Sequence, residues 1–271
     1  IDKISRYAHL SNYFLDEDCV YVADRLVAFS GKQGKVFFTN SGTEATEAAL
    51  KAVKKSSTVG KNKILFFKNG FHGRTLGALS INGFETLTGQ FMPLLENTVC
   101  LNINDCEELD RYMLENGQNT VAMFVEPIQG SGGVVSLIQK FAQKIEQYHK
   151  EYRFLLISDE VQAGLGRTGK IYSYQNYSLD PDIITLAKSL GAGLPLGAAV
   201  FLEESGSILK DPDHGSTFAP NPVALAGARV ITDKISEIVK EVNEKSEYLR
   251  KKLKPLTGEN IAEVRGIGLM L

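Results

Sequence analysis

The chain has 271 residues, of which 43% are hydrophobic and 23% are charged, and its formal net charge is −2. That length suits one large domain or one and a half, and the composition is that of an ordinary globular protein. The charge is too balanced for a nucleic-acid-binding surface, and no run of about eighteen apolar residues predicts a transmembrane helix. We therefore expect neither a nucleic acid nor a membrane as a partner.

The cysteines and the two ends of the chain bear on where the protein works. Cys19, Cys100 and Cys106 are odd in number and are not spaced as metal-binding pairs. This usage favours a reducing cytoplasm over a disulfide framework and predicts no metal site. Residues 1–3 lack the pattern of a signal peptide. The apolar run at 268–271 is typical of a strand, so we expect the sequence to be part of a longer protein.

Short apolar segments alternate along the chain with segments of helical periodicity. In chain order we predict strands at 36–39, 64–67, 121–126, 154–158, 183–186 and 198–202, and helices at 43–55, 107–116, 139–152 and 222–240. Most of the strands are apolar on both faces, as expected for a sheet that helices cover on both sides. The alternation predicts an α/β fold with a mainly parallel sheet sandwiched by helices.

The character of the sequence changes near its C-terminal end. From about Ser236 the chain is charged and helical, and it turns extended near 261–271. We interpret this change as the boundary between a large domain, residues 1–235, and the start of a small C-terminal domain, residues 236–271.

A glycine-rich segment, Gly164-Leu-Gly-Arg-Thr-Gly-Lys170, resembles two phosphate-binding motifs at once. It contains G-x-G-x-x-G and most of G-x-x-x-x-G-K, but Ile171 follows where a P-loop needs Ser or Thr. Both motifs also need a helix that begins at the last glycine, and the aromatic segment after Lys170 is unlike a helix start. We expect a tight loop beside an active site instead of a nucleotide site.

Two charged side chains stand at the ends of apolar strands. Lys188 follows the strand at 183–186 and enters a glycine-containing loop. An amine in an apolar setting has a lowered pKa and can act as a nucleophile, although a lysine extending out of a strand end has the same pattern. Asp159 follows the strand at 154–158, at the sheet edge where open α/β folds bind ligands. A helix N-cap or a metal ligand would leave the same signal.

Two further segments suit ligand binding. Thr39-Asn-Ser-Gly-Thr-Glu44 joins a strand to a helix, so free N–H groups and the helix dipole create an anion site there; a capping box explains the same residues. Phe71-His72-Gly73-Arg74 follows a strand. Its aromatic ring could stack on a cofactor, and Arg74 could bind a carboxylate, while His72 alone could be a structural hydrogen-bonding group.

A lysine, a strand-end carboxylate, a helix start and an aromatic ring are what pyridoxal 5'-phosphate (PLP) requires of a protein. The sequence resembles the class III PLP-dependent aminotransferases of the ornithine and acetylornithine type. The resemblance covers roughly residues 7–271, and its motifs appear in the family's order: Asn40-Ser-Gly-Thr-Glu-Ala45, Phe71-His-Gly-Arg-Thr-Leu-Gly-Ala78, Glu126-Pro-Ile-Gln-Gly130, Asp159-Glu-Val-Gln162 with Gly166-Arg-Thr-Gly169, Leu186-Ala-Lys188, and His214-Gly-Ser-Thr-Phe218 before Asn221-Pro222.

The resemblance implies a role for each residue around the cofactor ring. Lys188 would hold PLP as a Schiff base and move the proton during catalysis. Asp159 would pair with the pyridinium nitrogen, and Gln162 would hydrogen-bond the 3'-oxygen. Phe71 and Val161 would lie on the two faces of the ring. The fold would be type I, a seven-stranded mixed sheet with a small domain made from both chain ends.

The resemblance also implies the phosphate and substrate contacts. Gly42 and Thr43 would hold the phosphate. Thr217 would reach a phosphate too, but from the partner subunit, which implies a homodimer with shared active sites. Arg74 would bind the carboxylate of the substrate, and Ser216 would line the same pocket.

The sequence departs from the family pattern in several places. Ser131 stands where a glutamate usually follows Gln-Gly, so it cannot form that residue's ion pair with a C-terminal arginine. Ser189 and Ala192 replace glycines in the lysine loop, and Pro220 lies close to Thr217. The family also extends to about 400 residues. These departures bear on substrate choice and turnover, and none removes a group that holds PLP.

The function implied is transfer of the δ-amino group of N-acetylornithine to 2-oxoglutarate, giving N-acetylglutamate semialdehyde and glutamate. Ornithine, succinylornithine and 4-aminobutyrate are alternative donors, because the aminotransferases that use them share much of this motif pattern. An aminomutase is a further alternative among PLP enzymes. An alternative of another class is a non-catalytic fold relative that serves as a partner subunit. The retained lysine, aspartate and arginine argue against it.

Overall fold

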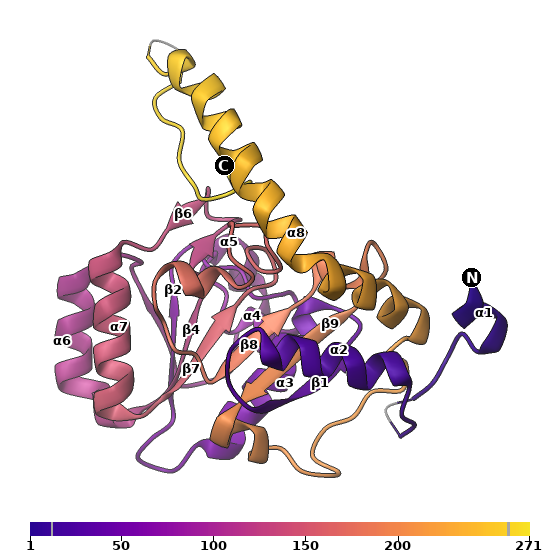
Figure 1. The fold of residues 1–271 in the computed structure, drawn as a ribbon. Coiled ribbons are helices and arrows are strands. Elements are labelled where there is room, and N and C mark those ends of the chain that lie inside the picture. Colours follow the sequence, from indigo (N-terminus) through magenta and orange to yellow (C-terminus); the bar gives the residue numbers. More distant parts are fainter. Residues whose placement is uncertain (12, 259–260) are drawn as a thin grey trace.

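The computed structural model describes residues 1–11, 13–258 and 261–271. Its centre is a seven-stranded sheet in the order β1-β9-β8-β7-β4-β2-β3 (Figure 1). The strands are β1 (Gly34–Thr39), β2 (Lys63–Phe67), β3 (Thr98–Leu101), β4 (Thr120–Val125), β7 (Leu155–Asp159), β8 (Ile183–Leu186) and β9 (Gly197–Leu202). Only β9 runs antiparallel to its neighbours within this sheet. The predicted mainly parallel α/β sheet and type I fold are confirmed.

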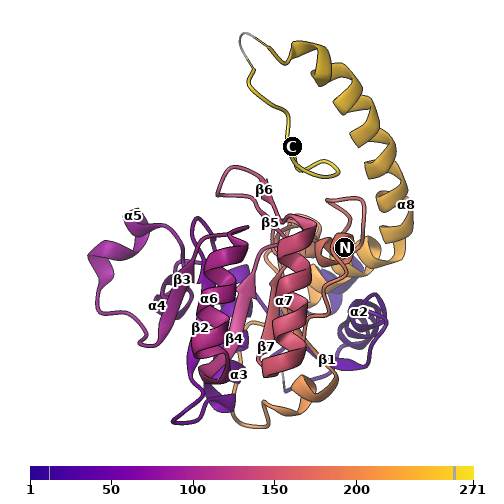
Figure 2. The ribbon, with the colours of Figure 1, turned by 90° about the vertical axis from the view of Figure 1, so that its left-hand side faces the viewer.

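Helices cover both faces of the sheet, as the apolar strands predicted. They are α1 (Asp2–Arg6), α2 (Glu17–Ala28), α3 (Gly42–Ser56), α4 (Leu76–Leu79), α5 (Glu85–Thr88), α6 (Cys106–Asn116), α7 (Gln139–Tyr152) and α8 (Pro222–Leu253). One face packs on α3, and the other on α2, α6, α7 and the first half of α8. Figure 2 shows α6 and α7 side by side on their face. Alternate side chains of one strand enter the two cores, as Leu65 and Phe66 of β2 do.

The six predicted sheet strands and the four predicted helices exist, with ends that differ by a few residues, and the largest difference is α8, which continues to Leu253. Several elements were not predicted, among them β3 and α2. Strand β3, Thr98–Leu101, lies at the sheet edge, and only Leu101 of its four residues is buried. It therefore lacks the long apolar run of a central strand. Helix α2 is capped by Asp16, whose side chain accepts a hydrogen bond from the backbone N–H of Asp18.

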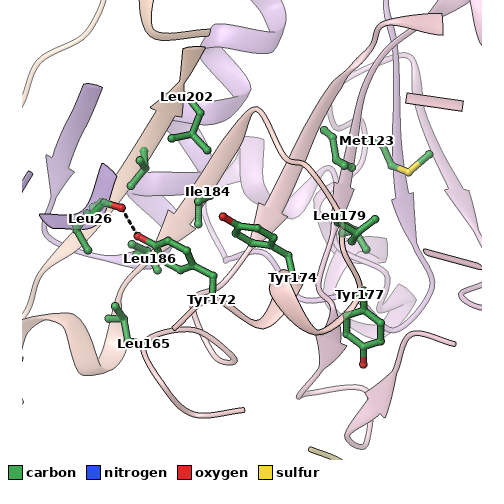
Figure 3. Packing of buried hydrophobic residues seen from close by; sticks show 14 of the residues in the cluster. Leu26, Met123, Leu165, Tyr172, Tyr174, Tyr177, Leu179, Ile184, Leu186 and Leu202 are labelled. Carbon is green, nitrogen blue, oxygen red and sulfur yellow. Dashed lines mark hydrogen bonds between the residues drawn. The ribbon is translucent and has the colours of Figure 1, made fainter. Parts of the chain in front are cut away.

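The larger core contains buried tyrosines as well as aliphatic side chains (Figure 3). Tyr172 is fully buried, and its hydroxyl donates a 2.7 Å hydrogen bond to the backbone carbonyl of Leu26. That bond satisfies the polar tip, so the ring adds apolar contact without an unpaired hydroxyl. It also ties the segment that follows the glycine-rich loop to helix α2.

The C-terminal part of the chain leaves the sheet along α8 and then turns back (Figure 1). The predicted boundary at 235/236 falls inside α8, which crosses it without a break. The predicted strand at 268–271 is wrong: a single bridge between Ile267 and Met270 closes a turn there. The N–H of Leu269 donates to the carbonyl of Arg167, so this turn rests on the glycine-rich loop. In the described part of the chain, no helix is long and apolar enough to cross a membrane.

Candidate active site

A pocket of about 530 Å³ opens at one edge of the sheet. Strands β1, β2, β7 and β8 all end at this edge because they run parallel to one another, and the loops that follow them form its walls. Its lining includes the predicted site residues Gly42, Thr43, Phe71, Arg74, Asp159, Val161, Gln162 and Lys188. Predicted site residues up to 146 positions apart, Gly42 and Lys188, therefore surround one cavity.

Lys188 stands two residues after the end of β8 and begins a short helical turn that ends at Gly191. Its φ of 44° places a non-glycine residue in the left-handed region, which costs free energy and is tolerated mainly where a site requires it. The pKa of its amine is lowered because the protein partly removes it from water, although the charges of Asp159 and Glu126 oppose the shift. A lowered pKa leaves more of the amine unprotonated and nucleophilic.

Asp159 ends β7 and is held by two hydrogen bonds. Its Oδ2 lies 2.7 Å from Nδ1 of His72, and its Oδ1 accepts from the backbone N–H of Val161 at 3.1 Å. Burial lowers the pKa of His72, but the hydrogen bond to Asp159 and the charges of Asp159 and Glu126 outweigh it, so the net shift is upward. The hydrogen bond fixes the orientation of the Asp159 carboxylate, whose remaining lone pairs are available to the pocket.

The turn before α3 has free donors and little space. Ser41 is the N-cap, and its hydroxyl accepts from the N–H of Glu44. The N–H of Ala45 is the first to bond within the helix, so the N–H groups of Gly42 and Thr43 have no partner in the helix itself. A Cβ on Gly42 would lie 3.0 Å from both γ-methyl groups of Val161. Glycine therefore lets Val161 pack directly against the helix start.

Gln162 and Arg74 also line the pocket. Nε2 of Gln162 donates to the hydroxyl of Ser131 at 3.2 Å, so the residue that departs from the family pattern contacts a predicted cofactor ligand. The guanidinium of Arg74 is exposed and lies 5.9 Å from the ring centre of Phe71. It is free to meet an anion that enters from solvent.

Two predicted site residues lie outside this pocket. Thr217 is exposed and does not line it, and neither does Ser216, whose hydroxyl accepts from the N–H of Ala219 at 3.2 Å. The preceding segment is held at the far end of α3, where Lys55 pairs with Asp213. A single chain therefore does not bring Thr217 to its own pocket.

The glycine-rich loop is not a phosphate site. No helix begins at Gly169; instead, a Cβ there would overlap Oδ1 of Asn243, and a Cβ on Gly166 would lie 3.0 Å from the Cγ2 methyl of Ile238. Both glycines have positive φ. They make a tight turn that packs against α8, in line with the expected loop beside the site.

Sequence reasoning gave no role to Glu126, and for His72 it offered only a structural hydrogen bond. Glu126 is 4% exposed and accepts from the N–H of Phe71 at 2.8 Å. Burial raises its pKa to about 7, with His72 opposing and Asp159 adding to the shift. Both residues lie inside the motifs of the family, but only the packing shows that His72 hydrogen-bonds Asp159 and that Glu126 is close enough for its charge to act on both. Among the described residues, no group of three or more His, Cys, Asp or Glu side chains could hold a metal ion.

These features fit PLP. The pocket joins a nucleophilic amine, a carboxylate hydrogen-bonded to a buried histidine, and free N–H groups at a helix start. The three provide for the aldehyde, the pyridine nitrogen and the phosphate of that cofactor.

Comparison with known proteins agrees with this geometry. The aminotransferase class-III family profile matches residues 2–271. Acetylornithine aminotransferase of Aquifex aeolicus is 40% identical over 273 residues, which cover 100% of this chain and 71% of that protein. Succinylornithine transaminase of Salmonella paratyphi A is 37% identical over 278 residues, covering 100% and 67%.

Solved structures give the same family. The ornithine aminotransferase of Toxoplasma gondii, with PLP at partial occupancy in its active site, superposes with a TM-score of 0.89 at 27% identity. The match covers 99% of this chain and 65% of that one. The chain belongs to the class-III aminotransferases and is a PLP-dependent transaminase.

Proposed function

We propose that the protein transfers the δ-amino group of N-acetylornithine to 2-oxoglutarate, giving N-acetylglutamate semialdehyde and glutamate. The observation that carries this proposal is the pocket with Lys188 opposite the start of α3, in a chain 40% identical to an acetylornithine aminotransferase. The free thiols of Cys19, Cys100 and Cys106 suit a reducing compartment, the cytoplasm.

When bound, PLP supplies an aldehyde that condenses with amines and a ring that withdraws electrons from the carbon bearing the amine. Lys188 would hold the cofactor through its amine, at the place that the amine of the donor then takes. Once free, the Lys188 amine would be the base that accepts the proton of the donor carbon and the acid that gives it back. Its lowered pKa favours the unprotonated form that both tasks need.

The other residues would orient the cofactor and polarise its ring. Asp159, which is hydrogen-bonded to His72, would pair with the pyridine nitrogen. Phe71 and Val161 would hold the ring between them, and Gln162 would donate to the 3'-oxygen. The N–H groups of Gly42 and Thr43 would bind the phosphate.

The substrate side uses Arg74 and a second copy of the chain. The exposed guanidinium of Arg74 binds the carboxylate of the donor or of 2-oxoglutarate in a bidentate contact. Thr217, which lies away from the pocket of its own chain, reaches the phosphate in the partner's site, and Ser216 lines the substrate pocket there. The active unit is therefore a homodimer with shared sites.

N-Succinylornithine is the second candidate donor, because a succinylornithine transaminase is 37% identical over the whole chain. The two donors differ only in the acyl group on the α-nitrogen. Ser131 bears on this choice, because a small neutral side chain beside Gln162 leaves room without adding a charge.

The first test is an absorbance spectrum of the full-length protein with PLP, before and after each donor. We expect a visible cofactor band that N-acetylornithine bleaches and 2-oxoglutarate restores. Lys188→Ala should remove the band, and Lys252→Ala, at an exposed lysine of α8, should keep it. A band that only succinylornithine bleaches would select the second candidate. No band that depends on Lys188 would refute the catalytic assignment.

A further inference from the structure

A chain of hydrogen bonds links the start of α3 to the loop that carries Arg74. The hydroxyl oxygens of Thr43 and Thr75 lie 2.9 Å apart. The hydroxyl of Thr75 donates to Oε1 of Glu47, and the N–H of Ala78 donates to the same oxygen at 3.1 Å. Glu47 therefore holds residues on both sides of the α4 start.

The donor directions in this chain follow from the chemistry of its end group. An ionised carboxylate only accepts, so the single hydroxyl proton of Thr75 points to Glu47. The contact between the two threonines then needs the hydroxyl proton of Thr43. The Thr43 hydroxyl also accepts, at 3.5 Å, from the N–H of Thr75. Its one proton is thus directed away from the pocket.

The backbone is built around these contacts. A Cβ on Gly73 would lie 2.2 Å from Oγ1 of Thr43, and a Cβ on Gly77 would lie 2.3 Å from Oε2 of Glu47. Asn82 holds the other side of the loop, since its Nδ2 donates to the carbonyl of Gly73 at 3.2 Å. The backbone is therefore fixed on both sides of Arg74: Asn82 holds Gly73 before it, and Thr43 holds Thr75 after it.

We propose that Glu47 and Thr75 are positioning residues that fix Arg74 through the hydroxyl of Thr43, and that this hydroxyl gives no hydrogen bond to the phosphate. The phosphate then depends on backbone N–H groups, while the Thr43 side chain serves recognition of the substrate carboxylate. This inference rests on the proposed function, in which Arg74 binds that carboxylate. It separates two roles, cofactor binding and carboxylate binding, within one residue.

The test measures two quantities on the full-length protein: the Kd of PLP, by titration of the cofactor-free form, and the KM of the donor, with the PLP-loaded form. Donors are N-acetylornithine and N-acetylputrescine, which is the same amine without the carboxylate. Thr43→Val and Thr75→Val should raise the KM of N-acetylornithine about 3- to 10-fold, the loss of one or two hydrogen bonds. The KM of N-acetylputrescine and the Kd of PLP should change less than about twofold.

Matched variants separate positioning from general damage. Thr75→Ser keeps the hydroxyl and should restore the wild-type KM. Thr88→Val removes a half-buried threonine hydroxyl that donates to the backbone carbonyls of Phe84 and Glu85, and should change neither quantity. Glu47→Gln keeps the size of the side chain and should raise the KM less than Glu47→Ala. Thermal unfolding of every variant identifies any that fail to fold.

Two results would overturn the inference. One is a Thr43→Val protein whose Kd for PLP rises about tenfold, the loss expected of a hydroxyl bonded to phosphate. The other is an equal rise in KM for both donors. Failure of the proposed function is distinct: wild type would then show no Lys188-dependent band, or Arg74→Ala would affect both donors alike.

Discussion

At the scale of single residues, Glu126 links the protonation state of the site to stability. Burial raises the pKa of its carboxyl to about 7, against an ordinary value near 4.3. Between these values the folded protein keeps a proton that the unfolded chain has released, so the free energy of unfolding falls as pH rises. The raised pKa of His72 acts in the same direction, because its contribution is complete below the ordinary histidine value and is lost above the folded one.

The corresponding prediction concerns Glu126→Gln in the cofactor-free protein. Glutamine keeps an acceptor for the N–H of Phe71 but does not titrate. The free energy of unfolding of the variant, relative to that of wild type, should therefore rise from pH 5 to pH 8. We expect a relative gain on the order of 1–3 kcal/mol, measured by urea unfolding at both pH values. Glu244→Gln, at an exposed position of α8, should show no such change. An equal difference at both pH values would contradict the raised pKa.

At the scale of elements, the start of α3 depends on the strand beside it. Gly197 begins β9 and pairs with Thr39 of β1. A Cβ on Gly197 would lie 2.4 Å from both the carbonyl oxygen of Ser41 and Oγ1 of Thr39. The first of these is backbone, which cannot rotate away. The close approach of β9 therefore determines where the N-cap turn, and with it the phosphate-binding N–H groups, lies.

Gly197→Ala should accordingly disturb both the fold and the cofactor site. We expect the free energy of unfolding to fall by about 1–3 kcal/mol, as for other overpacked interiors, and PLP to bind more weakly. Gly60→Ala is the control, because a Cβ there has no atom within 4 Å. Chemical denaturation and a PLP titration measure the two effects. Unchanged binding in a destabilised Gly197→Ala protein would separate β9 from the phosphate site.

At the scale of the whole molecule, the position of Thr217 makes the dimer testable. Lys188 lines the pocket of its own chain and Thr217 does not, so a shared site takes one residue from each subunit. Lys188→Ala and Thr217→Asp proteins should each be nearly inactive, the second because its carboxylate repels phosphate. Unfolded and refolded together, they should recover about a quarter of wild-type activity, since a mixed dimer keeps one intact site. No recovery, in a mixture shown to contain mixed dimers, would argue that each site is built from one chain.

The element pattern and part of the site follow from the sequence because their signals are local. An apolar run predicts a buried strand wherever it packs, and the residue after a strand lies at the sheet edge in any parallel arrangement. Lys188, Asp159 and the turn at Gly42–Thr43 were therefore found as separate strand-end or helix-start features. Strand β3 was missed because an edge strand of four residues carries too little apolar pattern.

Only the tertiary structure decided how these features act on one another. His72 meets Asp159 across 87 positions of sequence, and Glu126 meets the N–H of Phe71 across 55. The bond from Gln162 to Ser131 and the direction of the Thr43 hydroxyl likewise depend on how loops pack. Such contacts leave no periodicity in the sequence, because they join residues whose separation along the chain is set by the lengths of intervening helices and loops. The sequence by itself determined which chemical groups this protein has at the sheet edge, and the packing decided which of them hold one another in place.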